Sequence, residues 1–320
     1  MPYQILVSGS LAYDRIMDFP GRFREHLMPD KMHALSVSFS VRKMETRFGG
    51  NAGNIAYTLK LLGDVPIILA RAGNDFGLYQ TWLKARRIDA RSIEIDRNRH
   101  TAVAHMITDL DDNQIAAFAP GATRLPYPVT AAQLKSYRDA RLALVGPSHP
   151  SDIMRQCRAM QRAHIPYIAD PGQEITALTR AQLLELIRNA EALFGNDYES
   201  ELIQQKIKKT RSQLLRMVKF LVVTLGAKGS VIYTNNKAFA IPAVKPKRLI
   251  DPTGAGDAYR AGFIHAYVRG AALPDCGRVA SLVAARAIEH YGTQEHRLSG
   301  TDRARIKKIL SRHALRRGAH

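Results

Sequence analysis

The sequence predicts a three-layer α/β/α protein, in which helices cover both faces of a mostly parallel central sheet and a small β-sheet forms a lid. Short apolar runs typical of buried strands alternate with helical patterns along most of the 320 residues, as they do in repeated βαβ units. Two β-rich segments, 19–48 and 101–119, interrupt this alternation and predict the lid. Glycine-rich turns join several strands to the helices after them, and α/β proteins bind ligands at such turns.

Composition favours one large domain. With 46% hydrophobic residues, the chain can bury an extensive core. It has no run of about eighteen apolar residues, so we expect no membrane span. Cys157 and Cys276 are the only cysteines, which indicates a reducing compartment and excludes a cysteine metal cluster. The N-terminus enters a strand without the basic segment of a signal peptide, so we expect a cytoplasmic protein.

The net charge of +19 is the unusual feature of the composition. Basic residues concentrate at 206–219 and 297–320, which we interpret as amphipathic helices with solvated basic faces. A charge balance of this kind is also typical of nucleic-acid-binding proteins. No pairing of aromatic with basic residues supports that alternative, and the excess charge would equally attract an anionic small molecule.

The first strand is expected at 3–10, where a buried apolar run ends in Gly9 and Ser10. Asp14 follows shortly after it. Because ligands of open α/β sheets gather beyond the carboxyl ends of the strands, Asp14 is well placed to bind a hydroxyl group. The alternative is an aspartate in a surface turn.

Two segments carry the patterns of the lid. Residues 35–41 alternate strictly between apolar residues and serine, which predicts an antiparallel strand with one apolar and one polar face. Residues 101–108 and 114–119 predict a hairpin that turns at 111–113. Closing such a sheet over a ligand site would exclude water from it.

A glycine-rich segment, Gly-Gly-Asn-Ala-Gly-Asn at 49–54, enters a helix expected at 55–62. Gly50 would let the backbone approach a ligand closely. The Asn54 amide can donate to one hydroxyl group and accept from another, as a polyhydroxy ligand requires. Taken alone, the segment also fits an ordinary glycine-rich helix start.

Strands and helices take turns through the middle of the chain, which predicts right-handed βαβ units and a parallel sheet. Strands are expected at 67–70, 142–145, 166–169, 192–194 and 220–225, and helices at 78–86, 151–163, 180–190 and 273–288. A final helix, capped by Thr301, carries an apolar stripe made of Ile306, Ile309, Leu310 and Leu315.

Two turns in this region carry polar or glycine signals. Asn196 and Glu199 stand three residues apart at a helix start, so they can face the same side or form a capping box. Thr224 ends a strand and is followed by a tight turn with Gly226 and Gly229. This turn is neither a dinucleotide fingerprint nor a P-loop, and its Lys228 is expected to face solvent.

The most informative stretch is 251–263, Asp-Pro-Thr-Gly-Ala-Gly-Asp-Ala-Tyr-Arg-Ala-Gly-Phe, which joins an extended run (240–250) to a long apolar helix expected from 258. Backbone amides of Gly254, Ala255 and Gly256 would be free at the first helical turn, where they can bind an anion such as phosphate. Asp257 beside that anion is best explained as a base that takes a proton from an attacking hydroxyl group. The alternative is a capped helix after a glycine turn.

This stretch closely resembles the C-terminal signature of the ribokinase-like (PfkB-type) sugar and nucleoside kinases, although Pro252 replaces the threonine or small residue usual in that family. The segment 49–54 matches the N-terminal Gly-Gly-x-x-x-Asn signature, some 200 residues earlier. The resemblance covers almost the whole chain. Residues 9–14, together with the long lid before Gly49, look most like the bacterial adenosine-kinase-like branch.

The resemblance implies one ribokinase-like kinase domain over 1–320, with an α/β core at about 1–13, 49–98 and 120–320 and a lid at about 14–48 and 99–119. It implies that Asp257 is the catalytic base and that Gly254, Ala255 and Gly256 form the anion hole. The implied substrate contacts are Asp14, Gly50 and Asn54. The implied nucleotide contacts are Thr224, Gly226, Gly229, Asn196 and Glu199, of which Asn196 and Glu199 would hold Mg²⁺ through water.

The function implied is transfer of the γ-phosphoryl group of ATP to a primary hydroxymethyl group of a nucleoside, converting adenosine to AMP. An apolar lid face made of Leu35, Val37, Phe39 and Phe118 would suit a flat base. A kinase of ribose, fructose or another furanose sugar is the alternative, and a nucleic-acid-binding protein is the less favoured one. The resemblance also implies a monovalent cation such as K⁺, near a loop at 291–294 that borders the adenine, and either a monomer or a homodimer.

Overall fold

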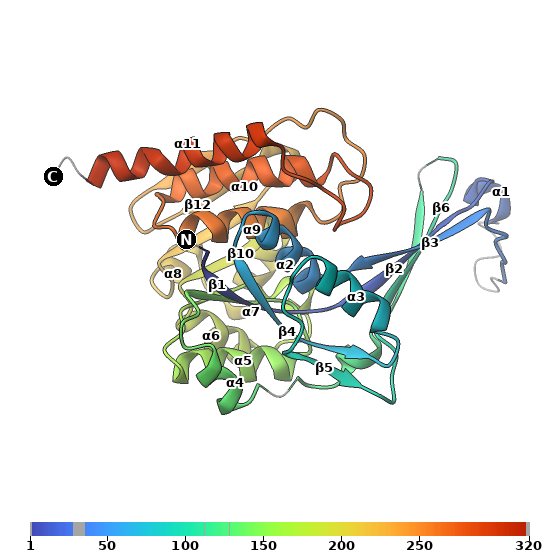
Figure 1. The fold of residues 1–320 in the computed structure, drawn as a ribbon, viewed down its shortest axis with the longest axis horizontal. Helices are drawn as coiled ribbons and strands as arrows, with labels where there is room; N and C mark the ends of the chain where they lie inside the picture. The colour runs from blue at the N-terminus through green and yellow to red at the C-terminus, as the bar shows by residue number, and fades with distance from the viewer. Residues whose placement is uncertain (1, 28–35, 112, 128, 318–320) are drawn as a thin grey trace.

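The computed structural model describes residues 2–27, 36–111, 113–127 and 129–317. Nine strands form the central sheet in the order β13-β12-β11-β10-β9-β8-β1-β4-β5, and four strands form a second sheet in the order β3-β2-β6-β7. The second sheet extends from one side of the core as an arm (Figure 1), and we call it the lid. The predicted fold class is confirmed.

The central sheet is parallel except for its last two strands, β12 and β13, which run antiparallel to their neighbours. Its strands are β1 (Gln4–Ser8), β4 (Val65–Gly73), β5 (Ile93–Asp96), β8 (Leu142–Val145), β9 (Tyr167–Ala169), β10 (Ala192–Asn196), β11 (Phe220–Thr224), β12 (Ser230–Tyr233) and β13 (Ala238–Ile241).

Helices cover both faces of this sheet (Figure 1). One layer contains α2 (Asn51–Leu61), α3 (Gly77–Ala85), α9 (Ala255–Tyr267), α10 (Leu273–Ala287) and α11 (Gly300–Arg317). The other layer contains α4 (Ala131–Ser136), α5 (Pro150–Arg162), α6 (Arg180–Arg188), α7 (Asp197–Ile207) and α8 (Arg211–Leu215). Local sequence sets several helix starts: Thr179 caps α6 and Thr210 caps α8, each in a capping box.

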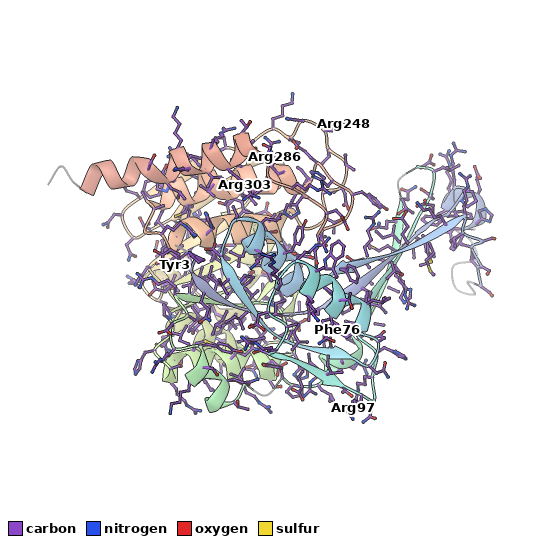
Figure 2. The ribbon with its side chains drawn as sticks, viewed as in Figure 1. Tyr3, Phe76, Arg97, Arg248, Arg286 and Arg303 are labelled. Atoms are coloured by element: carbon purple, nitrogen blue, oxygen red, sulfur yellow. The ribbon has the colours of Figure 1, made fainter. Side chains whose placement is uncertain are left out.

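Alternate residues of each strand enter the two hydrophobic cores on either side of the sheet. In β1, Ile5 and Val7 belong to the core beneath α2, α9 and α10, whereas Leu6 belongs to the core beneath α5, α6 and α7. This period of two explains why the strands read as continuous apolar runs. Figure 2 shows side chains filling both layers, and Phe76, labelled there, is fully buried near α3.

The parallel strands bring distant parts of the sequence to one edge of the sheet. The pairings of β8, β9, β10 and β11 are all parallel, so their carboxyl ends lie side by side. Asp170 directly follows β9, Asn196 ends β10 and Thr224 ends β11. The candidate site is built along this edge, as expected for an open α/β sheet.

The lid sheet contains β2 (Ala12–Asp18), β3 (Lys43–Gly49), β6 (Ala102–Thr108) and β7 (Gln114–Ala119). The predicted hairpin is present, because β6 pairs with β7 in antiparallel register. The sheet is mixed rather than antiparallel, since β2 runs parallel to β6.

The predicted lid strand at 35–41 was wrong for residues 36–41, which form no strand; Leu35 lies outside the described residues. The lid sheet ends at β3 on one side and at β7 on the other, and residues 36–41 add a strand to neither outer edge. Its apolar residues are half-buried and its serines exposed. Phe39 packs on Phe19 and Phe23, with ring centroids 4.9 and 5.0 Å apart, beside the short helix α1 (Phe23–His26) at the far end of the lid.

Other local predictions also need correction. Residues 206–219 do not form one helix, because Lys208 adopts a left-handed conformation (φ 52°) between α7 and α8. Residues 242–250 have no regular structure after β13, and Ser299 rather than Thr301 caps α11 by accepting from the Asp302 amide. Ile306 and Ile309 of α11 are buried as predicted. Within the described residues, no helix is both long and apolar enough to cross a membrane.

Candidate active site

The helix α9 begins in the middle of the signature stretch and presents free amides there. Gly254 is its N-cap and has a left-handed conformation (φ 77°). A Cβ atom at Gly254 would also lie 2.8 Å from Cγ2 of Thr293, so only glycine fits this turn. Among the described residues, the amides of Gly256 and Asp257 have no acceptor, whereas the Ala255 amide donates to the Pro252 carbonyl at 3.3 Å. The first helical turn can therefore bind an anion.

Asp251 holds this turn in place. Its Oδ1 accepts from the Thr253 amide at 2.9 Å, and its Oδ2 accepts from the Gly292 amide at 3.0 Å. The carboxylate thereby ties the turn before α9 to the loop after α10. Asp251 is the first residue of the signature stretch, and nothing in the sequence indicates this role.

Asp257 lies in the first turn of α9 and meets the helix α2. Its Oδ2 accepts a hydrogen bond of 2.8 Å from Nδ2 of Asn54. Burial raises the pKa of Asp257 to about 6, although the charge of Arg260 and the Asn54 hydrogen bond act in the opposite direction. A carboxylate of this pKa is ionised at neutral pH and still basic enough to take a proton.

Asp14 lies on β2 rather than in a turn beyond β1, and it faces the same space as Asp257. Burial, together with the charges of Asp251 and Asp257, raises the pKa of Asp14 to about 6. In the part of the chain that the structure describes, no group donates a hydrogen bond to its carboxylate. Asp14 is therefore available to accept hydrogen bonds from the hydroxyl groups of a ligand.

The two glycines before α2 have packing roles that the sequence did not reveal. A Cβ atom at Gly49 would lie 2.2 Å from Oδ2 of Asp14, so this glycine makes room for the carboxylate. Gly50 has a φ of 83°, and a Cβ there would lie 2.6 Å from the Ser10 carbonyl oxygen. The backbone contact with Ser10 explains Gly50 without a ligand.

Asn196 and Glu199 form the capping box that was one of their two interpretations. Oδ1 of Asn196 accepts from the Glu199 amide at 2.7 Å, and Oε2 of Glu199 accepts from the Asn196 amide at 2.8 Å. Burial raises the pKa of Glu199, and the charge of Arg260 opposes that shift. Glu199 therefore lies at the sheet edge, close enough to Arg260 to be influenced by it.

A buried ion pair beside Asp257 was missed by sequence analysis. Arg260 Nη2 donates to Oδ1 of Asp170 at 2.8 Å, and its Nε donates to Oδ2 of the same carboxylate. The Asp170 side chain is 2% exposed and that of Arg260 12% exposed. The available signal was an arginine three residues after Asp257 on one helix, with an aspartate directly after a buried strand.

The turn after β11 has the shape that its glycines predict. Gly226 and Gly229 both have positive φ values, and a Cβ at Gly229 would lie 2.1 Å from the Ile241 carbonyl oxygen. Thr224 is half-buried at the end of β11, and Lys228 is exposed as expected. This turn lies on the side of the sheet edge away from β1 and the lid.

One row of residues crosses the lid on the face that carries Asp14. The strand registers place Arg47, Asp14, Ala104 and Phe118 opposite one another on β3, β2, β6 and β7. Directly opposed residues project from the same face of a sheet. Phe118, which is 58% exposed, therefore shares the face of Asp14, whereas Phe39 at the far end does not join it. The predicted apolar lid face is reduced to Phe118.

The loop after α10 joins the lid to the core. Arg47 Nη1 donates to the Tyr291 carbonyl at 3.2 Å, and the guanidinium lies 4.6 Å from the centroid of the Tyr291 ring. Thr293 Oγ1 lies 2.8 Å from Oδ1 of Asn54, to which it donates, and Gln294 Nε2 donates to the same oxygen at 3.1 Å. These contacts were not predicted, because nothing in the sequence places the loop beside α2.

The chain is similar to proteins of one family. The model of the pfkB family carbohydrate kinases matches residues 8–299. A nucleoside kinase of Methanothermobacter thermautotrophicus is 35% identical over 296 residues, which cover 91% of each chain.

Solved structures show the same similarity. The nucleoside kinase of Burkholderia thailandensis in complex with inosine has a TM-score of 0.81 and 34% identity, covering 96% of this chain and 98% of that one; a second structure of that enzyme is a complex with ADP-inosine. The nucleoside kinase of Methanocaldococcus jannaschii, described as an archaeal member of the ribokinase family, has a TM-score of 0.83 and 29% identity, covering 97% and 98%.

Proposed function

The chain belongs to the pfkB family of carbohydrate kinases, and from this premise we propose that it transfers the γ-phosphoryl group of ATP to the primary hydroxyl group of a nucleoside, with adenosine as the expected acceptor. The coarser part of this function needs no proposal: the chain is a nucleoside or sugar kinase, a phosphotransferase with an alcohol group as acceptor. The observation that carries the transfer step is the Asp257 carboxylate, held by Asn54 beside the free amides of α9 and opposite Asp14. The choice of a nucleoside as acceptor is supported by the nucleoside kinases to which the chain is similar.

Asp257 acts as the base in the proposed reaction. The acceptor oxygen attacks the γ-phosphorus of ATP, Asp257 takes the hydroxyl proton, and the bond from the γ-phosphorus to the bridging oxygen breaks to release ADP. The amides of Gly256 and Asp257 bind the transferring group, with Gly254 and Ala255 shaping the turn. Arg260 remains paired with Asp170 and keeps the site from accumulating uncompensated negative charge.

Acceptor recognition is assigned to Asp14, Asn54 and the lid row. Asp14 accepts from ribose hydroxyl groups. Asn54 offers the same sugar only the second hydrogen of Nδ2, because its oxygen already accepts from Thr293 and Gln294 and its other hydrogen binds Asp257. Phe118 lies two strands from Asp14, about 10 Å away at the usual strand spacing. Ala104 between them leaves space for a ligand. This span suits a ribose at Asp14 with its base stacked on Phe118.

The nucleotide is expected at the other part of the sheet edge, along Thr224, Gly226 and Gly229. Mg²⁺ would be held here by Glu199 and Asn196 through water. The donor set fits that role: one oxygen of Glu199 is taken by the capping box, and no described residue binds the other, while both oxygens of Asp170 are used by Arg260. When bound, Mg²⁺ neutralises phosphate charge and keeps much of its water shell. Consistent with water-mediated binding, no cluster of three or more metal-ligating side chains occurs among the described residues.

The test is ADP release from MgATP with adenosine, inosine, ribose and fructose supplied separately. Turnover on nucleosides well above the sugars, with adenosine first, is the expected result. Turnover on a sugar alone would agree with the kinase family but would contradict the proposal of a nucleoside acceptor. Asp257→Asn should lower kcat by about a thousandfold, the middle of the range that acid–base groups contribute. A fully active Asp257→Asn protein would overturn the role of the base. Replacing K⁺ by a larger organic cation in the same assay tests whether the activity depends on a monovalent cation such as K⁺.

A further inference from the structure

Three hydrogen bonds connect the single tryptophan of the chain to the proposed base. Trp82 Nε1 on α3 donates to Oε1 of Gln294 at 3.1 Å. Gln294 Nε2 donates to Oδ1 of Asn54 at 3.1 Å, and Asn54 Nδ2 donates to Oδ2 of Asp257 at 2.8 Å. The four side chains come from α3, the loop after α10, α2 and α9, so only the folded chain assembles this row.

The chemistry of Trp82 gives the row one direction. An indole N–H group can only donate, so the atom of Gln294 that faces it must be the amide oxygen. The Gln294 nitrogen then faces Asn54, whose oxygen must accept and whose nitrogen must point at Asp257. The oxygen and nitrogen of a side-chain amide are otherwise hard to tell apart, but here each assignment follows from the donor before it. Thr293 Oγ1 is a second donor to Oδ1 of Asn54 at 2.8 Å, but its single proton is shared with the Phe48 carbonyl at 3.2 Å, so Gln294 is the main determinant of this orientation.

Burial makes the reverse orientation costly. Gln294 is 2% exposed and Asn54 is 6% exposed, so neither amide can turn toward water. A reversed Asn54 would place its oxygen against the carboxylate of Asp257 and its nitrogen against a second donor. Unpaired or repelling polar groups are expensive in a buried site. The row therefore holds Nδ2 of Asn54 as a hydrogen-bond donor to the Asp257 carboxylate.

The row also reaches the lid. Gln294 Nε2 lies 2.5 Å from the Tyr79 hydroxyl oxygen, and that hydroxyl donates to the Gly49 carbonyl at 2.8 Å. Tyr79 is fully buried. Gly49 ends β3 and lies against Asp14. A displacement of this lid strand would therefore change the hydrogen bonds of Tyr79 and Gln294, and through Gln294 the surroundings of Trp82.

We infer that Trp82, Gln294 and Asn54 form a one-way relay that holds the Asp257 carboxylate, with Gln294 as a positioning residue for the base and Trp82 as a reporter of acceptor binding. This inference rests on the proposed role of Asp257 and adds to it a reason why that carboxylate is held in place and stays ionised. Gln294 does not touch the reacting atoms; it acts through Asn54.

The test replaces the two donors to Asn54 and measures the pH dependence of kcat/KM. Gln294→Met removes one donor, and the double variant Gln294→Met/Thr293→Val removes both while keeping the Thr293 methyl group that contacts Gly254. Without these donors Asn54 can turn away, and the ionised form of Asp257 loses its hydrogen bond. We expect the acid limb of kcat/KM to move upward in both variants, by about one pH unit in the double variant.

Tyr57→Phe is the matched control. Tyr57 lies on α2 like Asn54, and its buried hydroxyl donates to the His296 carbonyl at 2.8 Å, two residues beyond Gln294. Removing it disturbs the same helix and the same loop without touching the relay. We expect Tyr57→Phe to unfold at a lower temperature than the unaltered chain and to keep the acid limb at its original pH.

Trp82 emission gives an independent readout. Adding adenosine without ATP should change the fluorescence of the unaltered protein, and the change should be smaller in the double variant at saturating adenosine. An unmoved acid limb in the double variant, with a lower kcat at every pH, would overturn the relay and reduce Gln294 to a packing role. That result is distinct from failure of the proposed function, in which Asp257→Asn would retain activity and the relay would have no base to position.

Discussion

Asn54 and Asp257 are 203 residues apart in the chain, and their side chains share a hydrogen bond of 2.8 Å. The contact is possible because α2 packs directly against α9. It places Asn54, whose amide is proposed to bind the acceptor, against Asp257, which is proposed to take the acceptor's proton. Binding and proton transfer therefore meet at one point, where a small error in acceptor position would affect both.

The pH dependence of kcat/KM should reflect the protonation of two carboxylates. Asp257 and Asp14 both have a pKa raised to about 6, and both are proposed to act as carboxylates. As the pH falls through this value each becomes protonated, so activity should fall more steeply than tenfold per pH unit. In Asp14→Asn the slope should return to about tenfold per unit. An unaltered protein whose activity is flat from pH 7 to 5 would contradict the assignment.

Phe118→Ala should discriminate between nucleosides and sugars. Loss of a stacking ring costs about 1–3 kcal/mol, so KM for adenosine should rise about 5- to 150-fold while any activity on ribose is unchanged. Phe39→Ala is the control, because that ring packs on Phe19 and Phe23 away from Asp14. It should lower the thermal stability of the protein and leave KM for adenosine unaltered. An equal effect of both changes would argue against base stacking on Phe118.

Gly254→Ala should damage catalysis more than folding. The new Cβ would require a left-handed alanine 2.8 Å from the Thr293 side chain, so the anion-binding turn must shift. We expect kcat to fall at least about tenfold, as removal of one oriented donor does in other sites. Gly63→Ala carries the same backbone penalty, since Gly63 has a φ of 91° but nothing within 4 Å of its Cβ position. Steady-state kinetics should separate the two variants.

Arg260→Met should lower stability strongly. It would leave the Asp170 carboxylate, which is 2% exposed, without its partner. Breaking a buried pair in this way costs about 3–5 kcal/mol of unfolding free energy. Urea unfolding should show the loss, and the double variant Arg260→Met/Asp170→Leu should recover much of it because no charge is then buried alone. Since Arg260 lowers the pKa of Asp257 and Asp170 raises it, Arg260→Met should also move the acid limb of kcat/KM to higher pH, and the double variant should move it less.

Much of the fold could be predicted because it depends on spacing along the chain. Apolar runs with a period of two predict buried strands, and glycine-rich turns predict the ligand-binding edge. The turn at 254–257, which we propose binds an anion, was also predictable, because Gly254 and the start of α9 are neighbours in sequence. For the same reason the capping box of Asn196 and Glu199 was one of two stated interpretations.

The remaining features depend on contacts between distant elements. The serine alternation at 36–41 could not reveal that Phe39 packs on Phe19 and Phe23 without the segment joining the lid sheet, so an extended segment was mistaken for a strand. The pairing of Arg260 with Asp170, and the relay from Trp82 to Asp257, arise only when helices and loops pack on the sheet. The sequence by itself determined most of the strands, the glycine turns and the position of the proposed base. Tertiary packing alone decided which polar groups face that base, because their hydrogen bonds join residues that sequence spacing does not relate.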